Sequence, residues 1–244
     1  MKYDTVKFES KGNIKMIAHR GLSGLERENT CPAFVAAGQR SYYGIETDVH
    51  ITKDGKFILC HDSDIERVTG VNMVIEETNF DTLRAIRFTD ICDDFPREDI
   101  FLPTLEEYVH ICKKYEKHPI LEIKGTFTGG QTLRIVEILK NFNMLEETVF
   151  ISFSKESCLS LKRVYPDARI QFLSEKPEAL ADALDFCLKN GFDADFSHKM
   201  ITKEAVDRIH ESGLLFNCWT VNTPELAEKM KELGVDFITT NVLE

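Results

Sequence analysis

Short apolar runs alternate with longer amphipathic stretches along most of this 244-residue chain. The short runs have the length of buried strands, and the longer stretches repeat apolar residues at helical spacing. This alternation is typical of a parallel α/β architecture, in which each helix carries the chain back to the start of the next strand. The predicted strands are 15–18, 44–49, 119–123, 149–153, 169–173, 192–196, 215–220 and 237–240. The predicted helices are 31–40, 104–117, 131–142, 155–165, 177–190, 202–212 and 224–233.

Eight strands with seven intervening helices predict a single (β/α)8 TIM barrel over 1–244, whose final helix is missing or very short. A chain of this length with 43% apolar residues can fill one such core. Residues 1–13 are available to cover the place of the missing helix. A doubly wound open sheet is the alternative, although no Gly-x-Gly-x-x-Gly motif follows the first strand to support a dinucleotide site.

The dipeptide Asp54-Gly55 stands between two alternating apolar stretches and predicts a two-residue hairpin turn. This turn makes 56–61 an antiparallel arm, which is therefore not counted among the eight strands. Counting outward from the turn places Asp48 directly opposite His61. Asp48 would then lie close enough to orient the His61 imidazole and to change its pKa.

Residues 62–103 interrupt the alternation. They contain acidic clusters, a short helical pattern around 82–86 and a loop-like segment over 90–103. We expect a small insertion within the barrel domain that rises over its mouth, shapes the pocket and limits the access of water.

Polar side chains occur at the ends of several predicted strands, where a barrel of this type places its active site. Glu46 and Asp48 are two residues apart, so an extended strand points both to one face. With Glu122 from another strand they form an all-oxygen set that suits one hard divalent cation, Mg²⁺ or Ca²⁺. The alternative is an ion-pair network in which Arg20 and Lys124 neutralise the acids.

Net charge and cysteine content limit the partners and the compartment. The charge of −11 and the pI near 5.2 argue against nucleic acid or an anionic membrane surface as a partner. Seven cysteines without paired spacing indicate free thiols in a reducing compartment. The sequence has no apolar signal segment and no run of about 18 apolar residues, so we expect a cytoplasmic protein without stable membrane association. Homo-oligomerisation stays open.

An ordered series of short motifs runs from the first predicted strand to the last. It comprises His19-Arg20-Gly21, Glu28-Asn29-Thr30, Glu46-x-Asp48, Thr52-Lys53-Asp54-Gly55, His61-Asp62 with Arg67 and Thr69-Gly70 after it, Leu102-Pro103-Thr104-Leu105-Glu106-Glu107, Glu122-Ile123-Lys124, Ser152-Phe153-Ser154, Trp219-Thr220-Val221-Asn222 and Gly234-Val235-Asp236-Phe237-Ile238-Thr239-Thr240-Asn241. The series spans roughly residues 14–241 and resembles the glycerophosphodiester phosphodiesterase family of TIM-barrel enzymes. One departure is Asn241, which stands where many members of the family have aspartate.

The resemblance implies metal-dependent hydrolysis of glycerophosphodiesters, such as glycerophosphocholine and glycerophosphoethanolamine, to glycerol 3-phosphate and an alcohol. On this interpretation His19 is the general base and His61 the general acid, with the reverse order left open. Arg20 and Lys124 bind the phosphate, and Trp219 packs against the glycerol or the leaving alcohol. The nucleophile is either water or a hydroxyl of the substrate's own glycerol.

Two further functions are alternatives: a lysophospholipase D-type activity, and a barrel that binds a phosphorylated metabolite without turnover. Two histidines together with three carboxylates favour turnover, because binding alone needs no acid and base. Glu28 and Asn29 are expected to hold His19 and Arg20 in place, while Trp219 is nearly as typical of a plain core residue. Surface or loop positions are expected for the remaining histidines, His50, His110, His118, His198 and His210.

Overall fold

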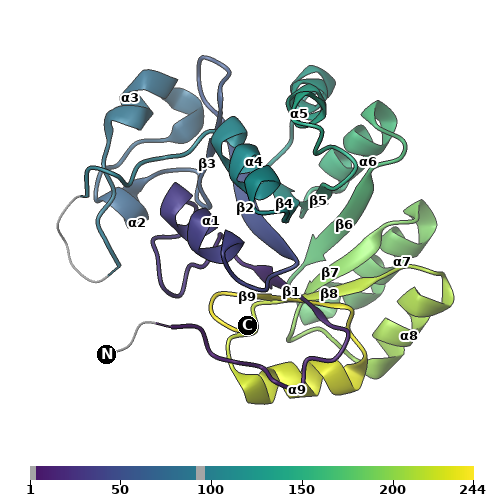
Figure 1. The fold of residues 1–244 in the computed structure, drawn as a ribbon. Helices are drawn as coiled ribbons and strands as arrows, with labels where there is room; N and C mark the ends of the chain where they lie inside the picture. Colours follow the sequence, from purple (N-terminus) through teal and green to yellow (C-terminus); the bar gives the residue numbers. More distant parts are fainter. Residues whose placement is uncertain (1–3, 92–96) are drawn as a thin grey trace.

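The computed structural model describes residues 4–91 and 97–244, and within them the predicted barrel is confirmed (Figure 1). Eight parallel strands form its wall: β1 (Lys15–Ala18), β2 (Gly44–Ile51), β4 (His118–Ile123), β5 (Val149–Ser152), β6 (Arg169–Ser174), β7 (Asp193–Ser197), β8 (Phe216–Trp219) and β9 (Phe237–Thr240). The wall closes because β1 pairs with β9 on one side and with β2 on the other. Each predicted strand is present to within two residues at either end.

Helices pack around the outside of this wall, as the sequence predicts. They are α1 (Cys31–Gly38), α4 (Leu105–Lys114), α5 (Gly129–Asn141), α6 (Lys155–Val164), α7 (Leu180–Asn190), which follows the short η2 (Pro177–Ala179), α8 (Lys203–Glu211) and α9 (Pro224–Leu233). Most begin at a side-chain cap, because a hydroxyl oxygen accepts a hydrogen bond from a backbone N–H of the first turn. These caps are Thr30, Thr104, Thr128, Ser154, Thr202 and Thr223. No helix in the described ranges combines the length and the apolar character needed to cross a bilayer.

The apolar core has an outer and an inner part because successive residues of a strand face opposite sides of the wall. The outer part lies between the strands and the helices and forms the largest cluster of buried side chains. The inner part lies inside the barrel and contains Ile17, Ile120, Val149, Ile151, Leu173 and Phe237. A filled interior of this kind leaves only the mouth of the barrel for a binding site.

The hairpin after β2 is present, but its register differs from the prediction. β3 (Phe57–Leu59) pairs antiparallel with β2. The backbone carbonyl of Asp48 accepts a hydrogen bond from the backbone N–H of Cys60 at 3.0 Å, so Asp48 lies opposite Cys60 and not His61. The predicted pairing was wrong by one residue because the loop holds three residues instead of two, with Gly55 at a φ of 78°.

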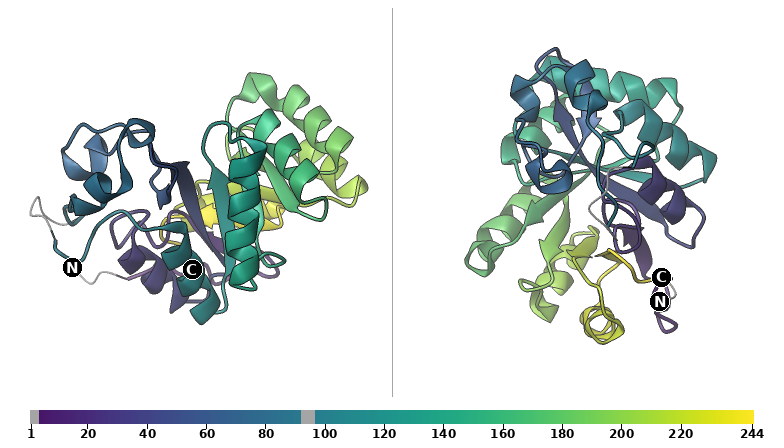
Figure 2. Two further views of the ribbon diagram at one scale, coloured as in Figure 1. Left: turned by 90° about the horizontal axis from the view of Figure 1, so that it is seen from above. Right: turned by 90° about the vertical axis from the view of Figure 1, so that its left-hand side faces the viewer.

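The segment between β3 and α4 contains α2 (Glu66–Thr69), η1 (Ile75–Glu77) and α3 (Phe80–Ala85) and has a small apolar cluster of its own. It stands at one side of the barrel, next to α1 and β3 (Figures 1 and 2). Arg27, from the loop after β1, joins it to the barrel through hydrogen bonds to backbone oxygens of Thr89 and Asp90. Residues 92–96 of the predicted insertion, 62–103, lie outside the described residues.

The N-terminal segment lies against the residues that follow β9. The backbone N–H of Val6 donates to Val242 at 3.0 Å, and that of Phe8 donates to Glu244 at 2.8 Å. The Phe8 side chain is buried in the outer core. The described part of 1–13 therefore packs beside the residues after β9, in the place that a final helix would take.

Cysteines in the described ranges are free, as predicted. They are Cys31, which is half-buried, and the buried Cys60, Cys112, Cys158, Cys187 and Cys218. Burial raises the pKa of several of these thiols, so they behave as small core residues.

Candidate active site

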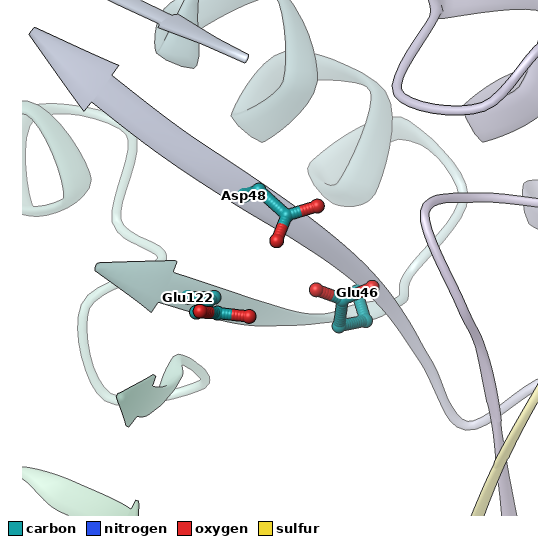
Figure 3. Close-up of side chains that lie close together, drawn as sticks. All are labelled: Glu46, Asp48 and Glu122. Carbon is teal, nitrogen blue, oxygen red and sulfur yellow. The ribbon is translucent and has the colours of Figure 1, made fainter. Parts of the chain in front are cut away.

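Three carboxylates converge inside the barrel mouth (Figure 3). Glu46 and Asp48 come from β2, and Glu122 comes from β4, where it pairs directly with Asp48. One oxygen of each lies within 4.8 Å of the others, and all three side chains are buried. We call these residues the carboxylate triad. The sequence predicts that Glu46 and Asp48 share a face, and the parallel pairing of β2 with β4 adds the third acid.

The environment of the triad does not balance its negative charge. Burial, followed by repulsion from Asp48, raises the pKa of Glu122 to about 8. The same two causes raise the pKa of Glu46 well above its usual range. Burial would also raise the pKa of Asp48, but Lys124 and Arg20 outweigh it and hold that pKa low. The triad therefore favours additional positive charge.

Two basic side chains neutralise the triad in part, as the ion-pair alternative predicts. Lys124 Nζ lies 2.9 Å from Glu122 Oε1 and 3.3 Å from Asp48 Oδ1. Arg20 Nε lies 3.8 Å from Asp48 Oδ2, and the backbone N–H of Arg20 donates to Glu46 Oε2 at 2.7 Å. Apart from this ion pair with Lys124, Asp48 Oδ1 accepts no hydrogen bond from the described residues. Three buried carboxylates beside two cations fit a hard divalent ion.

His19 follows β1, and its two ring nitrogens have different neighbours. Nδ1 lies 2.7 Å from Asn241 Oδ1, and Nε2 lies 4.0 Å from Glu46 Oε2. Because the amide oxygen accepts a hydrogen bond, Nδ1 carries the proton and Nε2 keeps its lone pair toward the triad. Burial and the nearby Arg20 lower the pKa of His19 to about 4. The ring is therefore neutral near pH 7, and Asn241, the departure in the sequence, orients it.

His61 follows β3, which pairs with β2, and is held by a chain of charged partners. Its Nδ1 is 2.7 Å from Asp62 Oδ1, and Asp62 Oδ2 accepts a hydrogen bond from Arg67 at 2.6 Å. Arg67 also makes two hydrogen bonds to Glu28. Burial lowers the pKa of His61 from its usual value. Sequence reasoning gave Asp62 and Arg67 no role, although the adjacency of Asp62 to His61 was the available signal.

Glu28 and Asn29 both contact Arg20, as expected. Glu28 accepts a hydrogen bond from Arg20 Nη1 at 2.9 Å, and the backbone N–H of Asn29 donates to the Arg20 carbonyl at 2.9 Å. The Asn29 side chain also donates to Asp48 Oδ2 at 2.8 Å and accepts from Thr47 at 2.7 Å. Arg20 and Asn29 both have φ values near +54°, so the loop turns back sharply enough for Asn29 to reach β2.

A cavity of about 280 Å³ opens at this end of the barrel. Both histidines, Arg20 and two members of the triad line one part of it. The remaining lining residues are Ile151, Phe153, Leu173, Glu175, Asp195, Trp219 and Thr239. Trp219 is half-buried, packs edge-to-face on Phe153 and donates its indole N–H to the Asp195 carbonyl. The tryptophan thus belongs to the cavity wall as well as to the inner core.

The expectation for the other histidines was wrong at His50. β2 extends two residues beyond the predicted strand, so His50 is buried within the sheet. Its Nε2 lies 3.5 Å from the backbone oxygen of His61, beneath the site. Of the remaining four, His110 and His210 are exposed, and His118 and His198 are half-buried.

Comparison with known proteins gives one consistent result. The model of the glycerophosphoryl diester phosphodiesterase family matches residues 19–244. The glycerophosphodiester phosphodiesterase of Bacillus subtilis is 29% identical over 97% of this chain and 88% of that protein. The enzyme of the same name from Caldanaerobacter subterraneus is 28% identical over 93% of each chain.

Solved structures share the fold. The Oleispira antarctica phosphodiesterase, solved in complex with the product sn-glycerol-3-phosphate, superposes with a TM-score of 0.84 at 23% identity and covers 93% of this chain and 92% of that one. A glycerophosphodiester phosphodiesterase from Parabacteroides distasonis gives a TM-score of 0.74 at 29% identity, over 94% of this chain and 93% of that one.

Proposed function

The chain belongs to the glycerophosphoryl diester phosphodiesterase family of phosphoric diester hydrolases, and we propose that it is a metal-dependent enzyme that converts glycerophosphodiesters to glycerol 3-phosphate and an alcohol. One observation carries this proposal: two imidazoles and part of a buried carboxylate triad line the same cavity. A site that only binds a phosphorylated metabolite has no need of two groups that exchange protons.

Glu46, Asp48 and Glu122 would hold one Mg²⁺ or Ca²⁺, since their donors are all hard oxygens. The bound ion would supply a positive charge that stabilises negative charge on the phosphoryl oxygens. Arg20 and Lys124 add to this effect, because both are half-buried cations that already lie beside the triad.

His19 acts as the general base. Its Nε2 is free to accept a proton, and Asn241 keeps the ring in the required orientation. His61 acts as the general acid, since Asp62 stabilises its protonated ring. The negative charge of a bound phosphodiester would raise the pKa of His61 and so counteract the effect of burial, which lowers it.

A substrate with p-nitrophenol as the leaving alcohol separates the two roles, because this alcohol leaves without protonation. His61→Ala should keep most of its activity on such an ester while losing it on glycerophosphocholine. His19→Ala should lose activity on both. The opposite pattern would exchange the base and the acid. Phosphorus NMR for a cyclic glycerol phosphate would distinguish attack by the substrate's own hydroxyl from attack by water.

The open end of the cavity suits a positively charged alcohol such as choline or ethanolamine. Phe153 is 42% exposed there, and its ring contacts Trp219. Glu175 adds an exposed carboxylate to the same wall. Aromatic faces together with a carboxylate are the usual surroundings of a bound quaternary ammonium group. Ester substrates with uncharged alcohols should therefore have a higher KM.

Segment 62–103 is a small insertion of the one barrel domain, and its described part supports the site from one side of the barrel. It supplies Asp62 and Arg67, which hold His61, and Arg67 links it back to Glu28 in the loop after β1. We assign the enzyme to the cytoplasm, with a small molecule and neither nucleic acid nor a membrane as its partner. The acidic net charge of −11 argues against nucleic acid and an anionic membrane surface as partners.

The proposed function is tested by incubating the protein with glycerophosphocholine and Mg²⁺ or Ca²⁺ and measuring glycerol 3-phosphate in a coupled assay. We expect release that EDTA abolishes and either metal ion restores. Binding without release would support a phosphometabolite-binding barrel instead. Faster release of choline from lysophosphatidylcholine, which leaves a lysophosphatidate, than from glycerophosphocholine would favour the lysophospholipase D-type activity.

A further inference from the structure

The interior of the barrel has two unlike sides. The carboxylate triad occupies the side of β2 and β4, whereas four buried polar side chains, one of them acidic, lie on β6 to β9. Asn217 is hydrogen bonded to two of the others, since its Nδ2 is 3.1 Å from Thr239 Oγ1 and 3.4 Å from Gln171 Oε1. We call this group the polar floor, and its members are Gln171, Asp195, Asn217 and Thr239. The chemistry proposed above uses none of them.

Asp195 is the acidic member of the polar floor and points into the barrel. Its neighbours Ala194 and Phe196 belong to the outer core, so alternation along β7 turns the Asp195 side chain to the inside. It pairs with Asn217 of β8 and lines the same cavity as His19. Asp195 is only 1% exposed, which places it at the bottom of that cavity and not at its rim.

One oxygen of this carboxyl group has no partner. Asp195 Oδ1 is buried and receives no hydrogen bond from the described residues. A buried polar atom without a partner costs about 1–3 kcal/mol, so its retention points to a ligand that supplies the missing bond. Burial raises the pKa of Asp195 to about 8, against the effect of a hydrogen bond from Asn217. Near neutral pH the group is therefore a carboxylic acid, which both donates and accepts hydrogen bonds.

A hydroxyl group matches this environment, because it also donates and accepts and carries no charge into the interior. β7 lies across the ring from β2, which carries two of the triad residues. A phosphate held at the triad keeps the adjacent hydroxyl of glycerol close to itself. The hydroxyl at the far end of the glycerol is the one that can reach the opposite wall.

We infer that Asp195 is a specificity-determining residue that hydrogen bonds to the terminal hydroxyl of the substrate's glycerol at the polar floor. This inference rests on the proposed function, because it takes the glycerol end of the substrate as the group that enters the cavity. It gives a partner to Asp195 Oδ1, the one oxygen of this buried carboxyl group that lacks one.

Calorimetric titration with two ligands, in the presence of Ca²⁺, tests the inference without relying on turnover. The ligands are sn-glycerol 3-phosphate and the phosphate of propane-1,2-diol, which lacks only the terminal hydroxyl. The wild type should bind glycerol 3-phosphate about 10-fold more tightly. Asp195→Leu should bind both ligands equally, with the affinity for the propanediol compound unchanged. Asp195→Asn, which keeps a donor and an acceptor, should retain most of the difference.

Ser197→Ala is the matched control, because Ser197 is a buried residue on the same strand that is not among the cavity-lining residues. It should leave both affinities unchanged. The inference is overturned if the wild type binds the two ligands equally, or if Asp195→Leu weakens both by the same factor, as a merely structural role predicts. Asp195→Ala serves as the second variant if Asp195→Leu does not fold.

The two proposals fail separately. A protein that shows the binding difference but releases no glycerol 3-phosphate from glycerophosphocholine would contradict the proposed function and support the role of Asp195. A protein that hydrolyses glycerophosphocholine and its propanediol analogue equally well, and binds both products equally, would overturn the role of Asp195 and leave the proposed function standing.

Discussion

Replacing Glu122 by glutamine should make the metal-free protein more resistant to unfolding at alkaline pH. Burial, and then Asp48, raises the pKa of Glu122 from 4.5 to about 8. Between these two pH values the folded state keeps a proton that the unfolded chain has released, so the free energy of unfolding falls as pH rises. At about 1.4 kcal/mol for each pH unit, the loss from pH 5.5 to pH 8.5 amounts to about 3 kcal/mol. Glutamine has no proton to lose and removes this slope.

Urea denaturation in EDTA at these two pH values measures the effect. The wild type should lose about 3 kcal/mol more than Glu122→Gln across the interval. Glu137→Gln, a change at an exposed position of α5, is the control and should behave as the wild type. Asp195 also has a raised pKa, but it is present in all three proteins and cancels in the comparison. Equal losses in all three proteins would refute the reasoning. Added Ca²⁺ should stabilise the wild type at the higher pH and not Glu122→Gln.

Three further predictions concern the histidines and the core. His19→Ala and His61→Ala should each lower kcat for glycerophosphocholine by about 10²–10⁴ with an unchanged circular dichroism spectrum. A variant that keeps the full rate on this substrate removes that residue from the mechanism. Asn241→Asp places a negative charge against His19 Nδ1 and should raise the pKa of that ring above about 4 in an NMR titration, whereas an unchanged pKa would argue against the contact. Tyr108→Phe removes a buried hydroxyl with two backbone partners at 2.6 and 3.0 Å. The free energy of unfolding should fall by about 1–3 kcal/mol in urea titrations, and a negligible loss would contradict the stabilising role of these hydrogen bonds.

The fold was predictable because every level of the sequence agrees with it. Parallel strands buried on both faces are short continuous apolar runs, and helices between them begin at threonine or serine caps. Thr104 and Thr128 even form complete capping boxes with the residue three positions on. The ends of these elements therefore follow from local chemistry, and few tertiary contacts were needed to place them.

The hairpin shows that local chemistry does not determine the register of two paired strands. A turn sequence with Asp54-Gly55 suits a loop of two residues or of three. The three-residue loop is held by tertiary contact, since Asp54 accepts a hydrogen bond from the backbone N–H of Phe80 in the following segment. A shift of one residue moved His61 away from the position opposite Asp48, and no pattern within the hairpin reveals it.

The site was partly predictable for the same reason. Strand alternation brings Glu46 and Asp48 to one face, and position at a strand end marks His19. The partners of these groups come from distant parts of the chain, such as Asn241 for His19. Asp195 was not predicted, although it stands two residues after Asp193 in a predicted strand, because it becomes unusual only when its surroundings are known to leave one oxygen without a partner.

The central claim is that the carboxylate triad binds one divalent ion beside two imidazoles. Crystals grown with Ca²⁺ and sn-glycerol 3-phosphate test it most directly, through the anomalous signal of the ion. We predict a single peak at about 2.3–2.6 Å from an oxygen of each triad residue, with the phosphate between His19 and His61. Electron density without an ion, in which the triad is contacted by Arg20 and Lys124 alone and the phosphate lies elsewhere, would contradict the claim.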